Sequence, residues 1–407
     1  MLSNLKTRLL CVWEQGGNLG HLSNLRLPIE VALEQGFEVV LAARELHRVG
    51  EVLGGLPITL LQAPFKQAIA PADQAAFLSY THLIGQQCFS SSVELEMYVR
   101  AWRGIFDLVQ PHIVLFEHSP TALVASTGYA FKKILVGASF AVPPSEKLHA
   151  SPFLPFPNTP QTDEVRSRLR QDDQCLLAVV NAALSKLQQP ALQALGQIYS
   201  QADQQFLLTW PELDQFGERQ AAHYLGVEPL QGAVTPQWPA GGGAKVFGYL
   251  QYFPAIEHFL RDIQAAKVCA LLLVRGLPPA IRQKFASDQI RFVDELVTLP
   301  QVAEQAAWVV HHGNHSTMST FLLTGTPQLL IPRHQEQLFG ALRLVSQGCA
   351  AMAFQDQTAF AAAIHALQTN AQLRQNATQI ASQCAPFDRD GVRATIRQTY
   401  SSFALSR

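Results

Sequence analysis

Short apolar runs alternate with helical patterns along the chain, and this alternation restricts the fold more than any other feature of the sequence. The first half holds five such runs, at residues 9–13, 37–42, 58–61, 112–116 and 134–137. A Gly-rich turn at 16–20 and a helical pattern over residues 21–35 follow the first run, and residues 72–109 are also predicted to be helical. Strands that alternate with helices favour an α/β protein with parallel sheets.

The second half follows a segment rich in Pro and Gly and repeats the same alternation. That segment spans residues 228–243 and ends in three consecutive glycines, a composition typical of a loop. Beyond it, strands are predicted at 246–250, 268–274, 291–293, 308–311 and 328–331, with helices over 255–264 and 316–323. We therefore predict one Rossmann-like domain over residues 1–235 and a second over 236–385, with a ligand site between the carboxyl ends of their strands.

Composition excludes several classes of protein. Lys and Arg number 30 against 31 Asp and Glu, for a net charge of −1, which argues against a nucleic-acid-binding protein because such proteins need excess positive charge. The six cysteines are scattered and form no C-x-x-C pair, so a reduced cytoplasm is the simplest location. The longest apolar stretches fall far short of the ~20 residues that span a bilayer. A peripheral contact with a membrane surface stays open, and the sequence does not indicate the oligomeric state.

The segment 309–337 carries the strongest signal for a binding site. It reads as a strand, a tight polar turn, a helix start, and then a second strand and loop. Gly313 and Asn314 tolerate left-handed backbone angles, and Ser316 and Thr317 suit the start of a helix. Free amides and the positive end of the helix dipole would face a diphosphate there, and His312 would add a donor.

This segment resembles the donor-binding signature of the UDP-glycosyltransferase superfamily, and in particular of its bacterial antibiotic and macrolide branch, which has the double histidine found here as His311-His312. The residues that fall on the signature without a gap are His312, Gly313, Thr317, Gly325, Pro327, Pro332, Glu336 and Gln337. Two positions depart from it: the usual second glycine is Asn314, and the glutamate that holds the donor ribose in many members is Thr320.

The resemblance implies a GT-B fold, with two Rossmann-like domains whose parallel sheets face one another across a cleft, and a final helix at 386–407 that crosses back to the N-terminal domain. It implies that His312, Ser316 and Thr317 hold the diphosphate, and that Glu336 and Gln337 bind the hydroxyls of the donor sugar. We also assign Gly20, Gly248, Val297, Gly313, Asn314 and Thr320 to the donor site. The co-substrate would be a UDP-sugar or, next, a dTDP-sugar, with no other cofactor and no metal.

A candidate for catalysis lies in the first domain. Gly20-His21 resembles the Gly-His at the head of the superfamily's first helix, where the histidine of inverting members is the general base. A histidine pKa near neutrality suits the removal of a proton from an acceptor hydroxyl. The family's orienting Asp ends a later strand, and the matching position here is Glu117. His118 is a second, weaker candidate base.

These predictions have alternatives. His21 could merely begin a helix while Glu117 is a solvated loop residue, and His311, His312 and His315 could suggest a metal site. Asp388 and Asp390 form a D-x-D sequence that we interpret as a turn and helix cap, and Asp172-Asp173 is interpreted as an exposed loop or helix start.

The acceptor is expected to be a small molecule or lipid that contacts residues 64–100 and 139–160. The apolar side chains that suggest this could instead be core, and they are Phe65, Phe77, Phe140, Phe153 and Phe156. A nucleotide-sugar epimerase or a catalytically silent nucleotide-sugar-binding protein stays open as a different function.

Overall fold

The computed structural model describes residues 6–17, 19–66, 77–86, 88–219, 222–229, 234–356, 358 and 360–405. Asn18 and the expected features at 72–76 and 230–233 lie outside these residues. The chain forms two compact units, the first comprising Met1–Leu208, Arg219–Leu225 and Asp388–Arg407, and the second comprising Thr209–Glu218 and Gly226–Phe387. This division differs from a single boundary at residue 235, because Trp210 and Leu213 are buried in the core of the second unit.

The first unit is built on a six-stranded sheet in which every neighbouring pair is parallel. In spatial order the strands are β3 (Thr59–Gln62), β2 (Glu38–Ala43), β1 (Arg8–Trp13), β4 (Ile113–Glu117), β5 (Lys132–Gly137) and β6 (Gln204–Leu207). The central strands β1 and β4 are almost continuously apolar and buried, as expected of parallel strands covered on both faces by helices.

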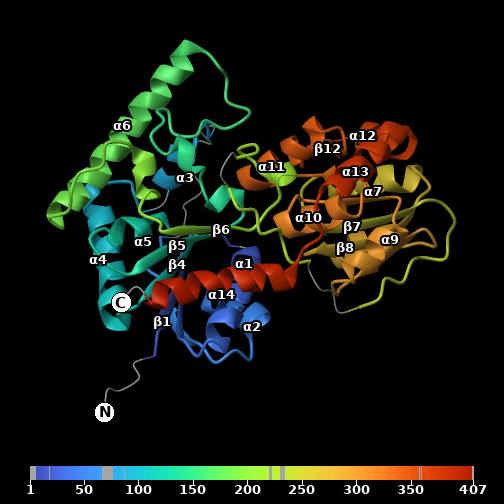
Figure 1. Cartoon of the computed structure of the whole chain (residues 1–407). Helices are drawn as coiled ribbons and strands as arrows, with labels where there is room; N and C mark the ends of the chain where they lie inside the picture. The colour runs from blue at the N-terminus through green and yellow to red at the C-terminus, as the bar shows by residue number, and fades with distance from the viewer. Residues whose placement is uncertain are drawn as a thin grey trace. The chain divides into compact units, whose positions relative to one another are not determined.

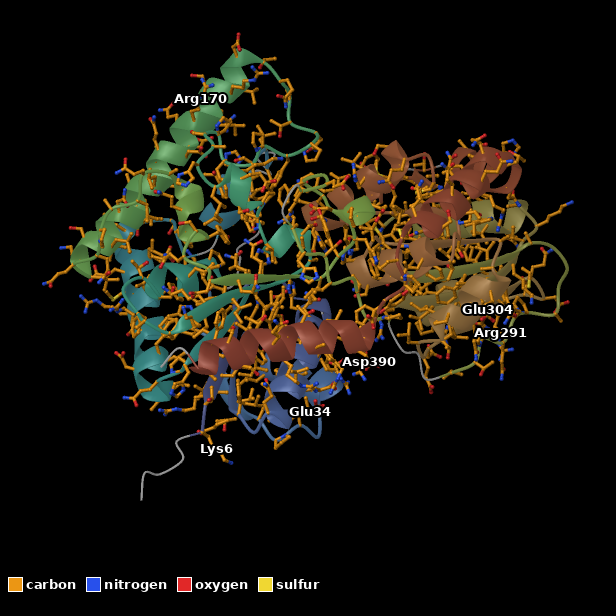
Figure 2. All side chains as sticks on the ribbon, in the orientation of Figure 1. Lys6, Glu34, Arg170, Arg291, Glu304 and Asp390 are labelled. Carbon is orange, nitrogen blue, oxygen red and sulfur yellow. The ribbon has the colours of Figure 1, made fainter. Side chains whose placement is uncertain are left out.

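Helices connect the strands of the first unit (Figure 1). They are α1 (Leu19–Glu34), α2 (Leu46–Leu53), α3 (Tyr80–Gly85), α4 (Ser92–Val109), α5 (Pro120–Ala125) and α6 (Asp163–Lys186). The unit also includes α14 (Arg389–Leu405), which follows the second unit in the sequence and connects no strands. The C-terminal helix α14 lies beside α1, and the hydroxyl of Tyr400 donates to the carbonyl of Pro28 at 3.3 Å. Figure 2 shows Glu34 of α1, which pairs with Arg393 of α14, and Asp390 in the first turn of α14.

The second unit has a sheet of the same kind, also parallel throughout. Its strands in spatial order are β12 (Ala350–Met352), β11 (Gln328–Leu330), β10 (Trp308–His311), β7 (Lys245–Gln251), β8 (Cys269–Arg275) and β9 (Ile290–Val293). Its helices are α7 (Ile256–Ala265), α8 (Pro279–Phe285), α9 (Leu299–Gln305), α10 (His315–Leu323), α11 (Gln335–Ser346), α12 (Ala361–Thr369) and α13 (Ala371–Gln383).

Both sheets follow one topology. When strands are numbered within each unit, each sheet has the order 3-2-1-4-5-6, the order of doubly wound Rossmann sheets. The strand order reverses between β1 and β4 in the first unit and between β7 and β10 in the second. Ligands of such sheets bind beyond the carboxyl ends of the strands at this reversal. Functional residues are therefore expected directly after these four strands.

Several local expectations need correction. The interpretation of Asp172-Asp173 as an exposed loop or helix start is wrong, because both lie in the middle of α6 and Asp173 is buried. Phe140, Phe153 and Phe156 are buried core residues, which favours the core alternative for these three. None of the described helices combines the length and the apolar composition that a membrane-spanning helix needs.

Candidate active site

A histidine and a glutamate meet at the strand-order reversal of the first unit. Glu117 is the last residue of β4 and pairs in register with Trp13, the last residue of β1. The chain then turns through Gly16, which has a φ of 81°, and α1 begins at Leu19, so that His21 is the third helical residue. The end of β4 and the turn before α1 thus bring two residues that are 96 positions apart to one end of the sheet.

The two side chains form a tight buried pair. Nδ1 of His21 lies 2.9 Å from Oε1 and 2.8 Å from Oε2 of Glu117. Glu117 is fully buried and His21 is only 8% exposed, so the interpretation of Glu117 as a solvated loop residue is wrong. Because a carboxylate only accepts hydrogen bonds, Nδ1 of His21 carries the hydrogen. Nε2 is then the nitrogen of the neutral ring that can accept a proton, which is the tautomer a general base needs.

The backbone of the turn accommodates the histidine ring closely. A Cβ atom on Gly16 would lie 1.9 Å from Nε2 of His21, so any side chain at this position would collide with the ring. The positive φ of Gly16 is also one that glycine adopts without strain. Gly16 therefore allows the turn and the ring to occupy neighbouring space, a role that the sequence pattern alone did not assign.

Aromatic rings surround the imidazole of His21. The indole of Trp13 stacks on it with centroids 5.6 Å apart and planes 23° apart. The ring of His118 lies 5.8 Å away and meets Phe140 edge-on. Burial first, and then the nearby charges of His21 and Arg44, lower the pKa of His118 to about 3. A base of that pKa is poorly matched to work near neutral pH, which favours His21 over His118.

A second carboxylate lies one residue beyond β1. Glu14 is buried and accepts hydrogen bonds from the backbone amides of Thr121 at 2.7 Å and Ala122 at 3.3 Å, and from the indole of Trp102 at 2.9 Å. It therefore binds the first turn of α5, where a helix dipole favours negative charge. Burial nonetheless raises its pKa to about 7. No motif in the sequence marks Glu14, which is a lone Glu after a strand.

In the second unit, two adjacent histidines hold the turn at the end of β10. Nε2 of His311 donates to Oε1 of Gln328 at 2.9 Å, and its Nδ1 accepts from the amide of Gly313 at 3.0 Å. Nδ1 of His312 donates to the carbonyl of Ile331 at 2.7 Å, and its Nε2 accepts from the amide of Gln251 at 2.8 Å. These hydrogen bonds engage all four ring nitrogens, which disfavours the metal-site alternative.

Both histidines are neutral supports of the turn. Burial lowers the pKa of His311 to about 4 and also lowers the pKa of His312. His312 joins β10 to the end of β7 through Gln251, so it lies at the strand-order reversal of this unit. From the sequence, His312 was expected to donate to a diphosphate, whereas its Nδ1 donates here to the carbonyl of Ile331.

The first turn of α10 lacks the usual side-chain cap. Asn314 occupies the N-cap position without capping the helix, because its Oδ1 accepts a hydrogen bond from the side-chain Nε2 of Gln337 at 2.8 Å. The Oε1 atom of Gln337 accepts from the backbone amide of Arg333 at 2.9 Å. Gln337 thus links the turn to the loop before α11, and the amides of the first α10 turn stay uncapped by Asn314.

The other residues assigned to the donor occupy varied places. Thr317 is fully buried in the first turn of α10 beside the half-buried Ser316, and the hydroxyl of Thr320 donates to the carbonyl of Ser316 within the helix at 3.0 Å. Glu336 lies in the first turn of α11. Val297 is buried in the core with Tyr249.

Gly20 and Gly248 contrast with each other. Gly20 is exposed in the first turn of α1, with space around it. Gly248 lies inside β7, where a Cβ atom would come within 2.6 Å of Leu272 and 3.2 Å of Val310. Close packing between strands therefore accounts for the glycine at position 248.

Comparison with known proteins bears on the fold. No family model and no curated protein sequence matches the chain. Solved structures do match it, and one is the glycotransferase of kitacinnamycin, with a TM-score of 0.67, 15% sequence identity and 98% of both chains covered. The glycosyltransferase SnogD from Streptomyces nogalater matches with a TM-score of 0.60 and 16% identity, covering 98% of this chain and 99% of that one. The spinosyn rhamnosyltransferase SpnG complexed with thymidine diphosphate matches with a TM-score of 0.59 and 16% identity, covering 97% of this chain and 100% of that one. The chain therefore has the two-domain GT-B fold that the resemblance of its sequence implied.

Proposed function

We propose that this protein is an inverting, metal-independent glycosyltransferase, which moves a sugar from a nucleoside-diphosphate sugar to a hydroxyl of a small-molecule or lipid acceptor. The observation that carries the proposal is the buried pair of His21 and Glu117 at the strand-order reversal. A pair of this kind converts a histidine into a general base with a fixed tautomer. The similarity to solved glycosyltransferases supports the same activity.

In the proposed reaction, Nε2 of His21 takes the proton of the acceptor hydroxyl. The hydroxyl oxygen forms a bond to the anomeric carbon of the donor sugar as the bond from that carbon to the diphosphate oxygen breaks. The nucleoside diphosphate leaves from the opposite face with the bonding electrons, so the configuration inverts. Glu117 stabilises the imidazolium through the hydrogen bond from Nδ1 and does not itself take the proton.

The diphosphate of the donor would bind the first turn of α10. Uncapped amides and the helix dipole attract a negative charge there, and Asn314 leaves these amides uncapped. The hydroxyl of Thr317 is fully buried and has no hydrogen-bond partner among the described residues. A buried hydroxyl without a partner costs about 1–3 kcal/mol, and a phosphate oxygen would satisfy it. His311 and His312 would act by holding the turn in shape.

The nucleotide is proposed to be uridine or thymidine diphosphate. The signature in the second unit resembles that of the UDP-glycosyltransferase superfamily, which favours UDP-sugars. The similar structures named VinC and SpnG are complexes with dTDP and thymidine diphosphate, which supports dTDP-sugars as the second class. Glu336 and Gln337 are the residues proposed to select the sugar, with Gln337 exchanging its hydrogen bond to Asn314 for one to the donor.

A thermal-shift panel of UDP-, dTDP- and GDP-sugars tests donor binding, since a ligand that binds the folded state raises its melting temperature. His315→Pro removes the first amide of α10 at a position that tolerates proline, and His315→Ala controls for the lost side chain. Ala371→Pro makes the same backbone change at the first residue of α13. We expect a UDP- or dTDP-sugar to raise the melting temperature of the wild type. The increase should be smaller in His315→Pro and unchanged in Ala371→Pro. No shift with any donor would contradict the proposal.

A further inference from the structure

We propose that Asn24 is a positioning residue for the reaction, which holds the carboxylate of Glu117 in the orientation that serves His21; this inference rests on the proposed function. Asn24 lies three residues after His21 on α1, so both side chains emerge on the same side of the helix. Its Nδ2 atom donates to Oε1 of Glu117 at 3.1 Å.

The orientation of the Asn24 amide follows from chemistry. A carboxylate accepts hydrogen bonds and donates none, so the nitrogen of the amide must face it. Oε1 of Glu117 then receives two donors, Nδ2 of Asn24 and Nδ1 of His21, while Oε2 receives the same Nδ1 at a similar distance. Hydrogen bonds to a charged group are about twice as strong as neutral ones. The second donor fixes the rotation of the carboxylate about its terminal bond, which the shared Nδ1 contact alone does not do.

The space for this arrangement is provided by a glycine on the neighbouring strand. Gly137 ends β5, and a Cβ atom there would lie 3.2 Å from Oε1 of Glu117 and 3.7 Å from Nδ2 of Asn24. Gly137 has a φ of 145°, which suits glycine. The carboxylate of Glu117 thus lies between α1, β4 and β5, and within this space the side-chain amide of Asn24 donates a hydrogen bond to it.

Loss of Asn24 should therefore weaken catalysis through Glu117 and leave substrate binding intact. We expect Asn24→Ala to lower kcat about tenfold, the effect of one hydrogen bond to a charged group, with KM unchanged because the pair acts in the transition state. Asn24→Asp keeps the shape but replaces the donor with a second carboxylate oxygen, and should lower kcat at least as much. Ser23→Ala is the matched control, since within the described part of the chain the hydroxyl of Ser23 bonds only the carbonyl of Leu19 in its own helix.

A double-mutant cycle separates positioning from a structural role. If Asn24 acts through Glu117, adding Asn24→Ala to Glu117→Ala should cause no further loss of kcat. A merely structural role in α1 would lower the melting temperature and reduce kcat equally in both backgrounds. A lower melting temperature together with an equal reduction of kcat in both backgrounds would overturn the inference.

An NMR measurement decides the question without any transfer assay. The Nδ1–H proton of His21 is observed in protein with ¹⁵N-labelled histidine and assigned by its loss in His21→Gln. The variants Asn24→Ala and Asn24→Asp should shift this resonance, although neither changes His21, and Ser23→Ala should leave it in place. An unchanged resonance in both Asn24 variants would overturn the inference. A shifted resonance in a protein that uses no donor sugar would support the positioning while contradicting the proposed function.

Discussion

The buried carboxylate of Glu14 should make stability depend on pH in a defined direction. Burial raises its pKa from 4.5 to about 7 in the folded protein, while the unfolded chain keeps the ordinary value. The folded state then binds more protons than the unfolded state between these two values. The stabilising contribution of protonated Glu14 is fully present below about pH 4.5 and is lost as the pH rises through about 7.

The size of the effect follows from the shift. One pKa unit corresponds to 1.36 kcal/mol, so a shift of this size corresponds to about 3 kcal/mol. Glu14→Gln mimics the protonated side chain and removes the titration. Relative to the wild type, the free energy of unfolding of Glu14→Gln should therefore rise by about 3 kcal/mol between about pH 4.5 and about pH 8.

Urea unfolding of both proteins across this pH range measures the difference, and the contributions of other titrating groups cancel in it. The hydrogen bonds from Thr121, Ala122 and Trp102 favour the charged carboxylate, so they limit the effect. A difference that stays constant across the range would refute the reasoning. The reasoning would also be refuted if the free energy of unfolding of the wild type rose with pH relative to that of Glu14→Gln. That result would mean that these hydrogen bonds lower the pKa of Glu14 more than burial raises it.

Two further predictions concern the first unit. Asp173→Ala should lower the free energy of unfolding by about 3 kcal/mol in chemical denaturation, because the carboxylate accepts hydrogen bonds from Thr81 at 2.5 Å, Ser151 at 2.9 Å and the backbone amide of Phe153 at 2.8 Å. The neighbouring Asp172→Ala should lower it by less than about 1 kcal/mol. Equal decreases in the two variants would contradict this prediction. Gly16→Ala should reduce the rate of sugar transfer about 100-fold, because the added methyl group displaces the ring of His21. Gly36 has a similar φ of 78° but open space around it, so Gly36→Ala should introduce backbone strain without displacing that ring. Equal transfer rates in the two variants would refute the steric argument.

The fold was predictable because its signal is local. Nearly continuous apolar runs such as β1 and β8 are buried on both sides of a parallel sheet, and such runs are visible in the sequence. The helix α6 was not recognised, because its polar surface and paired aspartates resemble a loop. The division between the units was also placed differently, because the chain around Trp210 packs in the core of the second unit, whereas the segment Arg219–Leu225 belongs to the first unit.

The site was predictable only in part. His21 and Glu117 were named because a resemblance marked both positions, and no local pattern indicates that residues so far apart share a hydrogen bond. The contribution of Gly16 depends on a distance to the ring of His21, and the hydrogen bonds of His312 depend on strand β7. Such long-range contacts are set by the packing of strands and helices, which the sequence pattern does not specify. Asn24 had one usable signal, its position three residues after a candidate base.

The central claim is that His21 is the base for sugar transfer, and His21→Ala tests it most directly. Donor affinity by thermal shift and transfer rate by product formation should be measured on the same preparations of wild type and variant, with the donor identified in the panel. We predict unchanged donor affinity and a transfer rate reduced at least about 100-fold, the usual contribution of a general base. Full transfer by His21→Ala would contradict the account.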